Sequence, residues 1–181
     1  MQKRNATVAV IGAGDYIGAE IAKKFAAEGF TIFAGRRDGA KLEPLVREIE
    51  AAGGSIVARA LDARKEDEVT AFLNDADKHA PLEVTIFNIG ANVNFPILET
   101  TDRVFRKVWE MACWAGFVTG RESARLMLPR GQEPEVKARL IANTQSAVER
   151  GVFGSPTFFV GKEMFFGKEQ LREVEELISG K

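Results

Sequence analysis

Two spacings of apolar residues alternate along the first 130 positions of the chain. Short runs of β-prone residues predict buried strands, and each run is followed by apolar residues at helical spacing, such as Ile17, Ile21 and Phe25. The predicted strands are residues 7–11, 30–34, 55–61 and 84–87, and a long helix follows from Thr101 or Asp102 to about Leu128. Strands that alternate with helices form a parallel sheet through right-handed crossovers. The pattern therefore predicts a three-layer α/β fold with strand order 3-2-1-4.

Three glycines follow the first predicted strand. Gly12, Gly14 and Gly18 lie between a Val/Ile run and the first helix. In a dinucleotide-binding turn the first glycine lets the chain turn, the second lets the backbone approach a pyrophosphate, and the third lets the helix pack close to the strand. The spacing predicts a dinucleotide site at the helix N-terminus. The alternative is an ordinary strand-to-helix turn that binds nothing.

Polar residues follow the other predicted strands at the same edge of the sheet. Arg36 and Arg37 come after the second strand, where arginine accommodates the 2′-phosphate of NADP and an acidic residue would select NAD. Asp62 follows the third strand and residues 88–92 follow the fourth, and ligands of parallel sheets bind at this carboxyl edge. These positions favour NADP over NAD as the cofactor. The alternative for the two arginines is a solvated loop.

Composition and charge argue against several other functions. The formal net charge is -1 with both signs mixed, so no basic surface for nucleic acid or an anionic membrane is expected. No apolar run is long enough to cross a bilayer and no signal-peptide segment precedes the first strand, so a cytoplasmic protein is expected. The single Cys113 excludes an internal disulfide and is predicted to be a small buried residue. His79 has no second ligand nearby, so we expect it in a surface loop, and we expect no metal site.

The pattern changes after Gly131. The predicted elements beyond it are a helix, two short strands and a second helix, at residues 136–148, 157–160, 164–166 and 171–178. Ser155-Pro156, directly before the first of these strands, is explained by a tight turn that directs an apolar strand into a core. The sequence thus predicts two parts, 1–131 and 132–181, packed into one composite domain. Because an exposed apolar sheet edge would aggregate, residues 157–160 are predicted to add a fifth, parallel strand beside residues 84–87, and residues 164–166 a sixth, antiparallel strand at the edge, in the order 3-2-1-4-5-6.

The first part resembles the N-terminal half of a short-chain dehydrogenase/reductase. The matching motifs, in order, are the glycine-rich turn, the NADP-selecting arginines, the adenine-contacting aspartate and the Asn-Ala-Gly motif, which here reads Asn88-Ile89-Gly90. The resemblance implies an NADP-binding oxidoreductase and a homodimer through the 102–128 helix. It implies that the cofactor contacts Gly12, Gly14, Tyr16, Ile17, Gly18, Arg36, Arg37, Asp62, Asn88 and Gly90. One departure is Tyr16, which stands where the family usually has glycine and which would either line the cofactor or crowd it.

A second departure concerns the chemistry. The family acts through a Tyr-x-x-x-Lys pair in which the tyrosine is the acid/base, whereas Tyr16, in the cofactor turn, is the only tyrosine of this sequence. The catalytic residues are therefore unassigned, and hydride transfer is expected to be absent or very slow. The only nearby polar candidates for a proton donor are Asp15, Asn92 and Asn94.

The second part resembles the closing segment of DsbA-like thioredoxin folds, most closely 2-hydroxychromene-2-carboxylate isomerase and kappa-class glutathione transferases. That resemblance implies glutathione contacts at Ser155 and Pro156, and a thioredoxin-like β-hairpin and helix that extend the Rossmann-like sheet. The segment that carries the catalytic serine or cysteine of those families has no counterpart here. Three hypotheses follow: an NADP-binding protein of reductase ancestry, a non-catalytic recombined or engineered hybrid, and a glutathione-dependent isomerase or transferase.

Overall fold

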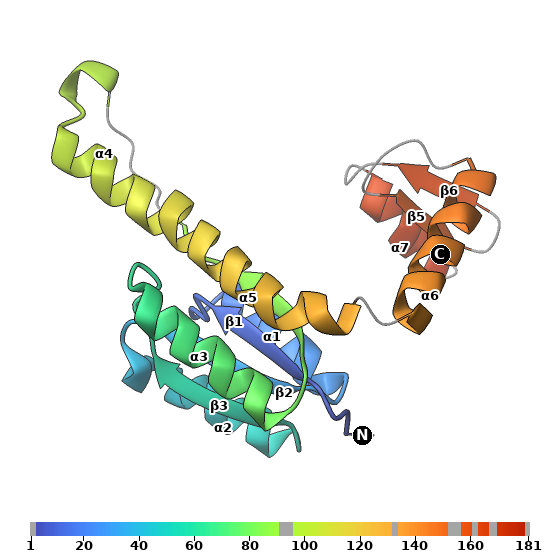
Figure 1. Ribbon diagram of the computed structural model, residues 1–181, viewed down its shortest axis with the longest axis horizontal. Helices are drawn as coiled ribbons and strands as arrows, with labels where there is room; N and C mark the ends of the chain where they lie inside the picture. The colour runs from blue at the N-terminus through green and yellow to red at the C-terminus, as the bar shows by residue number, and fades with distance from the viewer. Residues whose placement is uncertain are drawn as a thin grey trace. The chain divides into compact units, whose positions relative to one another are not determined.

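The computed structural model describes residues 3–90, 96–131, 134–151, 157–160, 163–166 and 170–179 (Figure 1). The chain divides into two compact units, Met1–Arg130 and Gly131–Lys181. The elements up to the end of the first unit are β1 (Thr7–Ile11), α1 (Ile17–Ala27), β2 (Thr31–Arg36), α2 (Glu43–Ala51), β3 (Ser55–Ala60), α3 (Glu66–His79), β4 (Leu82–Phe87), α4 (Asp102–Trp109) and α5 (Ala115–Gly131).

Strands β1 to β4 form one parallel sheet in the order β3-β2-β1-β4, which confirms the predicted order. β1 lies in the middle, where Val10 is in register with Ala34 of β2 and Ile86 of β4. Since the strands are parallel, their carboxyl ends meet at one edge of the sheet. The residues that follow these ends, and not the strands themselves, are therefore placed to bind a ligand.

The sheet is covered on both faces. Val8 and Val10 of β1 pack with buried residues of α1 and α2, whereas Ala9 and Ile11 pack on the opposite face with residues of α3 and with Val118 of α5. Successive residues of a strand point to opposite faces, and here both faces are apolar. This is why β1 appears in the sequence as an uninterrupted apolar run and not as an alternating one.

α5 is attached to β4 and to α3, the helix that precedes it. The Ser123 hydroxyl donates a hydrogen bond of 2.9 Å to Oγ1 of Thr85. The Arg130 guanidinium donates to the backbone carbonyl of Leu82 at 2.7 Å and forms an ion pair of 2.8 Å with Asp77. These contacts hold the helix along the strand that ends in the Asn88 motif.

The predicted 102–128 helix is interrupted. A π-helical segment, Glu110–Trp114, joins α4 to α5, and the helix continues through Pro129 to Gly131. Its N-terminus is capped by Thr101, whose side chain accepts a hydrogen bond from the Val104 amide at 3.4 Å. Cys113 lies in the π-helical segment and is exposed, so the prediction that it is buried was wrong. Ala115, two residues further on, is fully buried and contacts the core in its place. The spacing of apolar residues in this stretch did not show which of them faces the core.

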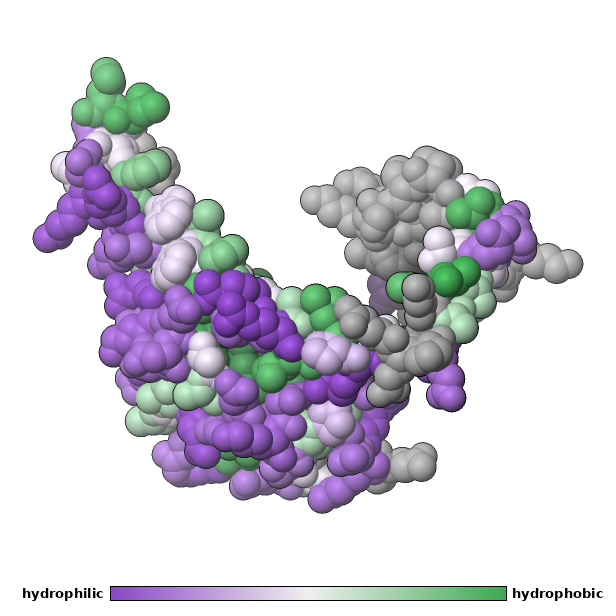
Figure 2. Space-filling view, viewed as in Figure 1, coloured by the Kyte–Doolittle hydropathy of each residue, from purple (hydrophilic) through white to green (hydrophobic). Residues whose placement is uncertain are grey.

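Large apolar side chains are exposed along this long helix. Phe105 is 65% exposed, Phe117 is 55% exposed and Trp109 is 47% exposed. Ile97 and Leu98, which precede α4, are almost fully exposed. Figure 2 shows apolar residues gathered at the far end of α4, which Figure 1 draws extending past the sheet. Exposed apolar side chains gathered in this way are typical of a protein contact surface.

The second unit contains α6 (Pro134–Glu149), β5 (Thr157–Val160), β6 (Glu163–Phe166) and α7 (Leu171–Ser179). β5 pairs antiparallel with β6 in a two-stranded sheet of its own, with Thr157 in register with Phe166. The antiparallel pairing of β5 with β6 confirms the predicted hairpin, whereas the described strands form two separate sheets and not the predicted six-stranded one. Strand pairing over a long sequence separation is decided by tertiary packing, whereas the short turn between β5 and β6 favours a local hairpin.

His79 is exposed but lies at the last position of α3, not in a loop, and its ring packs edge-on at 5.7 Å from Phe33. Among the helices that the structure describes, none is both long and apolar enough to cross a membrane.

Candidate functional site

The glycine turn after β1 is closed by direct backbone contacts. Gly12 has φ +90°, and a Cβ atom at this position would lie 2.5 Å from the carbonyl oxygen of Asn88. A Cβ at Gly18 would lie 2.4 Å from the carbonyl oxygen of Gly12. The Asn88 side chain donates to that same Gly12 oxygen at 3.1 Å. Gly12 and Gly18 thus permit the tight turn, and Asn88 fastens it to the end of β4.

A pocket of about 340 Å³ lies over this turn. Its lining brings together seven of the residues predicted to contact a cofactor, namely Gly12, Gly14, Arg36, Arg37, Asp62, Asn88 and Gly90. A Cβ atom at Gly14 or at Gly90 would meet no atom within 4 Å, so the backbone is open to the pocket at both positions. An open backbone beside a helix N-terminus is what a pyrophosphate requires, so these residues fit a dinucleotide.

Basic residues lie at the end of the pocket formed after β2. Arg36, the last residue of β2, is 21% exposed and forms an ion pair of 2.6 Å with Asp15 of the glycine turn. Arg37 is exposed, and no hydrogen bond or ion pair joins its side chain to the described part of the chain. Lys41 forms an ion pair of 3.7 Å with Asp38, and both residues line the pocket.

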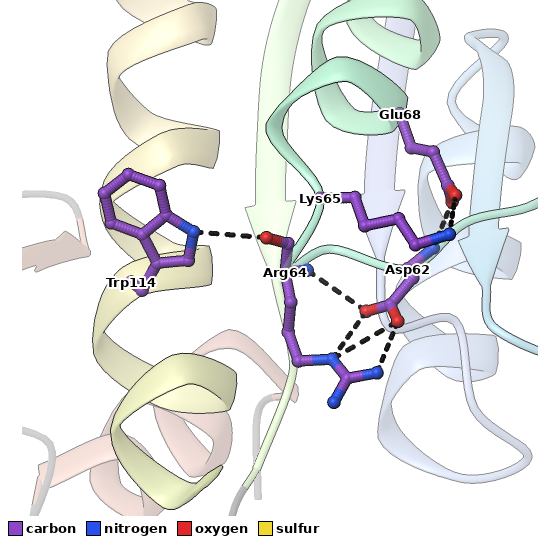
Figure 3. A network of polar contacts seen from close by, with 5 residues as sticks. All are labelled: Asp62, Arg64, Lys65, Glu68 and Trp114. Carbon is purple, nitrogen blue, oxygen red and sulfur yellow. Dashed lines mark hydrogen bonds and ion pairs between the residues drawn. The ribbon is translucent and has the colours of Figure 1, made fainter. Parts of the chain in front are cut away.

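Asp62 is held in a polar network at the end of β3 (Figure 3). Both of its carboxylate oxygens accept hydrogen bonds from the Arg64 guanidinium, the shortest at 2.5 Å, and one also accepts from the Arg64 amide. The Asp62 amide donates to Glu68 at 2.8 Å, and Glu68 pairs with Lys65 at 2.7 Å. The indole of Trp114 donates to the Arg64 carbonyl at 3.1 Å. The network fixes the Asp62 carboxylate at the pocket wall and connects that wall to the long helix.

Arg64 also sets the charge of this carboxylate. Its hydrogen bonds are the main reason that the pKa of Asp62 is lowered from the ordinary 3.8 to about 2, and the positive charge of Arg37 acts in the same direction. Asp62 is therefore ionised at any physiological pH. Its oxygens point to Arg64 and remain able to accept from a further donor in the pocket.

This shift predicts a pH-dependent stability. Because the folded-state pKa lies below the ordinary value, the ionised Asp62 stabilises the fold above about pH 4, and that stabilisation is lost as the pH falls toward 2. Asp62→Asn should lower the free energy of unfolding by about 1–2 kcal/mol at pH 7. This value is smaller than the full pKa shift would give, because solvent screens the partly exposed ion pair. Urea unfolding of the variant and the parent, followed from pH 7 to pH 2, should give two curves that converge at the acid end. A difference in free energy of unfolding between the two proteins that stays constant from pH 7 to pH 2 would contradict the stabilising role of the ionised Asp62.

Several predicted site residues lie outside the pocket wall. Tyr16 is 85% exposed and Ile17 is 67% exposed, and neither lines the pocket, while Gly18 is buried against the turn. Tyr16 therefore does not crowd the pocket in this structure. Ser155 and Pro156, and the candidate proton donors Asn92 and Asn94, lie outside the described residues. Within the described ranges no group of three or more acidic, histidine or cysteine residues could hold a metal ion.

Sequence reasoning missed part of the pocket wall. Lys41 and Arg64 line it, and so do Met111 and Ala115 at the π-helical end of α5. For Arg64 a signal was available, because it stands two residues after a strand-end aspartate and could bond back to it. For Met111 and Ala115 there was none, since their position depends on how the long helix crosses the sheet edge.

A parallel sheet that carries a glycine turn, a helix N-terminus and a pocket at its carboxyl edge defines a Rossmann-type nucleotide-binding fold. The model of the short chain dehydrogenase family matches residues 6–152. The chain belongs to the short-chain dehydrogenase family, and its oxidoreductase ancestry and NAD(P)-type site follow from that membership.

Individual relatives agree with this result. A crystal structure of a short-chain dehydrogenase from Rhodopseudomonas palustris is 72% identical, with a TM-score of 0.70, and the match covers 81% of this chain and 78% of that one. Galactitol 2-dehydrogenase (L-tagatose-forming) from Cereibacter sphaeroides is 34% identical over 127 residues, which are 70% of this chain and 49% of the relative. A crystal structure of an F189W actinorhodin polyketide ketoreductase with NADPH is 25% identical, with a TM-score of 0.68, over 72% of this chain and 52% of that one.

The extent of these matches bears on the second unit. The chain spans about half the length of the curated dehydrogenase it matches at 34% identity. The family match runs to residue 152 and so takes in α6, which the sequence analysis had placed in the DsbA-like part. The comparisons give no support to a DsbA-like C-terminal part, and that resemblance stays a prediction for residues 153–181.

Proposed function

We propose that this protein binds NADP(H) in the pocket at the carboxyl edge of its sheet. Backbone amides around Gly14, at the N-terminus of α1, would bind the pyrophosphate. Arg37 and Lys41 would bind the 2′-phosphate, and the Asp62 carboxylate would accept from the adenine amino group. The single observation that carries the proposal is that residues from the ends of all four strands line one pocket.

The choice of NADP over NAD rests on charge. Three basic residues, Arg36, Arg37 and Lys41, and one acidic residue, Asp38, border the pocket after β2. Arginine stands directly at the end of the strand, where an NAD-selecting acidic residue would otherwise grip the ribose. The related polyketide ketoreductase with NADPH supports the same choice by analogy. The cofactor would supply or accept a hydride when bound.

Turnover is expected to be absent or very slow. Tyr16 is the only tyrosine, and its side chain points to solvent instead of the pocket. Asp15, the one candidate proton donor that the structure describes, is held as a carboxylate because its hydrogen bond from Arg36 lowers its pKa. An ionised, ion-paired carboxylate is a poor donor to a carbonyl oxygen. The protein is therefore proposed to keep the cofactor site of its family without the usual acid/base group.

Calorimetric titration with NADPH and NADH tests the proposal. We expect binding of NADPH with at least a tenfold weaker affinity for NADH, since loss of a bidentate phosphate contact costs about that much. Oxidation of bound NADPH by a panel of ketones, followed at the nicotinamide absorbance, should proceed no faster than in free solution. Absence of heat with either dinucleotide would overturn the proposal and favour the non-catalytic hybrid. Turnover with bound cofactor would contradict the expected lack of catalysis and would leave the proposal of cofactor binding in place.

We further propose that the long helix forms a homodimer interface. The support is the exposed apolar surface of Phe105, Trp109 and Phe117. Sedimentation velocity should show a dimer for the parent chain and a monomer for Phe105→Glu, because burying an unpaired carboxylate in such an interface is strongly unfavourable. Asn143→Asp, at an exposed position of α6 and outside this helix, adds the same single negative charge and is the control. A parent chain that is monomeric at high micromolar concentration would contradict this proposal.

Glutathione binding is a second candidate. The observation that favours it is the order of the second unit, in which the antiparallel pair β5 and β6 precedes α7, as in the closing segment of a thioredoxin fold. Retention on immobilised glutathione and elution by free glutathione would support this function. A chain that passes through the resin while it binds NADPH would exclude it.

A further inference from the structure

The glycine turn of this chain carries an acidic residue that reaches the arginines at the end of β2. Asp15 Oδ1 accepts from Arg36 Nη1 at 2.6 Å, and Oδ2 lies 3.5 Å from Nη2, so the contact is close to the two-pronged arrangement of an arginine and a carboxylate. Nη1 also donates to the Lys41 carbonyl at 3.4 Å. Arg36 is thus held on two sides, by the glycine turn and by the short 3₁₀ helix Gly39–Leu42.

The two partners differ in exposure. The Arg36 side chain is 21% exposed, whereas Asp15 is 67% exposed. The hydrogen bond from Arg36 lowers the pKa of Asp15, so this carboxylate carries its full charge near neutral pH. A negative charge open to solvent therefore stands beside Arg36, at the basic end of the pocket.

Arg37 offers a contrast one residue further on. It lines the same pocket and is exposed, and the described residues give its side chain no hydrogen-bond or ion-pair partner. Its positive charge contributes to the lowered pKa of Asp62, which lines the same pocket. Of the two adjacent arginines, one is occupied by a carboxylate and the other is available to a ligand anion.

We infer that Asp15 determines the coenzyme preference of this site by neutralising Arg36. With the pair intact, Asp15 and Arg36 together present no net charge, and a 2′-phosphate is read by Arg37, with Lys41 beside it. Loss of the Asp15 charge would release a second guanidinium for the phosphate and would remove the carboxylate that repels it. The inference rests on the proposed function, because it assumes that an adenosine 2′-phosphate reaches this end of the pocket.

The test is a set of dissociation constants for NADPH and NADH, measured by calorimetry on the full chain. Asp15→Asn is expected to strengthen NADPH binding roughly tenfold while NADH binding changes less than about twofold. Arg37→Gln should weaken NADPH by roughly tenfold and leave NADH nearly unchanged. Asp15→Asn combined with Arg36→Gln removes both charges at once and should return the NADPH preference to that of the parent chain. This return is the result that a merely structural role of Asp15 would not give.

The control is Asp75→Asn, an exposed residue of α3 outside this pocket, which changes the net charge by the same amount. The fragments 2′,5′-ADP and 5′-AMP should show the same shift in relative affinity as the dinucleotides, since they differ in the phosphate under test. An unchanged NADPH to NADH ratio in Asp15→Asn, with both cofactors still bound, would overturn the inference and leave the proposed function in place. Failure of the parent chain and all variants to bind either dinucleotide would overturn both.

Discussion

Replacement of Gly12 by alanine is expected to lower the free energy of unfolding of the first unit by roughly 3–5 kcal/mol, a large part of the stability of an ordinary domain. Two causes add. An L-residue at φ +90° is strained, and its Cβ would lie 2.5 Å from the Asn88 carbonyl oxygen and 2.8 Å from the carbonyl carbon. Both of these are backbone atoms, so relief requires that β4 or the turn move, with loss of the Asn88 hydrogen bond to the Gly12 carbonyl.

The measurement is urea unfolding followed by tryptophan fluorescence. Both tryptophans, Trp109 and Trp114, belong to the first unit, so the signal reports on that unit by itself. Gly14→Ala is the matched control, because a Cβ at Gly14 would meet no atom within 4 Å and its φ is not positive. The control should unfold within about 0.5 kcal/mol of the parent. Equal stability of the two variants would show that the turn is not closed as the structure has it.

Gly14→Asp is expected to weaken binding of both NADPH and NADH by at least about 100-fold, because it places a side chain and a negative charge where the pyrophosphate approaches. The open space at this position means that the fold should be kept, so binding and stability separate at one residue. Calorimetry gives the affinities, and the same tryptophan unfolding curve verifies the fold.

Two variants make the Gly14 experiment decisive. Gly120→Asp in α5, where a Cβ would also meet nothing within 4 Å, adds the same charge away from the pocket and should leave affinity unchanged. Gly14→Ala should give an intermediate loss, since it adds bulk without charge. If Gly14→Asp binds NADPH as the parent does, the pyrophosphate lies elsewhere and the pocket is not the cofactor site.

Asp15 and Asp62 are both aspartates that follow a strand, but their roles in the structure differ. Each is an aspartate beside a predicted phosphate or nucleoside position, and each is bonded to an arginine. Asp62 pairs with Arg64 only two residues away, so local spacing was enough to suggest the contact. Asp15 pairs with Arg36 across 21 residues and between two strand ends, and only the register of β1 and β2 brings them together. The Asp62–Arg64 contact organises a turn, whereas the Asp15–Arg36 contact alters the charge of a binding surface.

The sequence by itself determined the elements of the first unit, the order of its sheet and the position of the glycine turn. These follow from local rules: residue period separates strand from helix, glycine permits a positive φ, and crossovers between parallel strands have one hand. Only the tertiary structure decided that Cys113 is exposed, that Tyr16 points to solvent, that β5 and β6 form a sheet separate from that of β1 to β4, and that Arg36 is bound to Asp15. Each of these features depends on which residues, distant in sequence, lie next to one another in the folded chain. The sequence pattern does not specify such neighbours, because the local conformation is the same whether or not the contact forms.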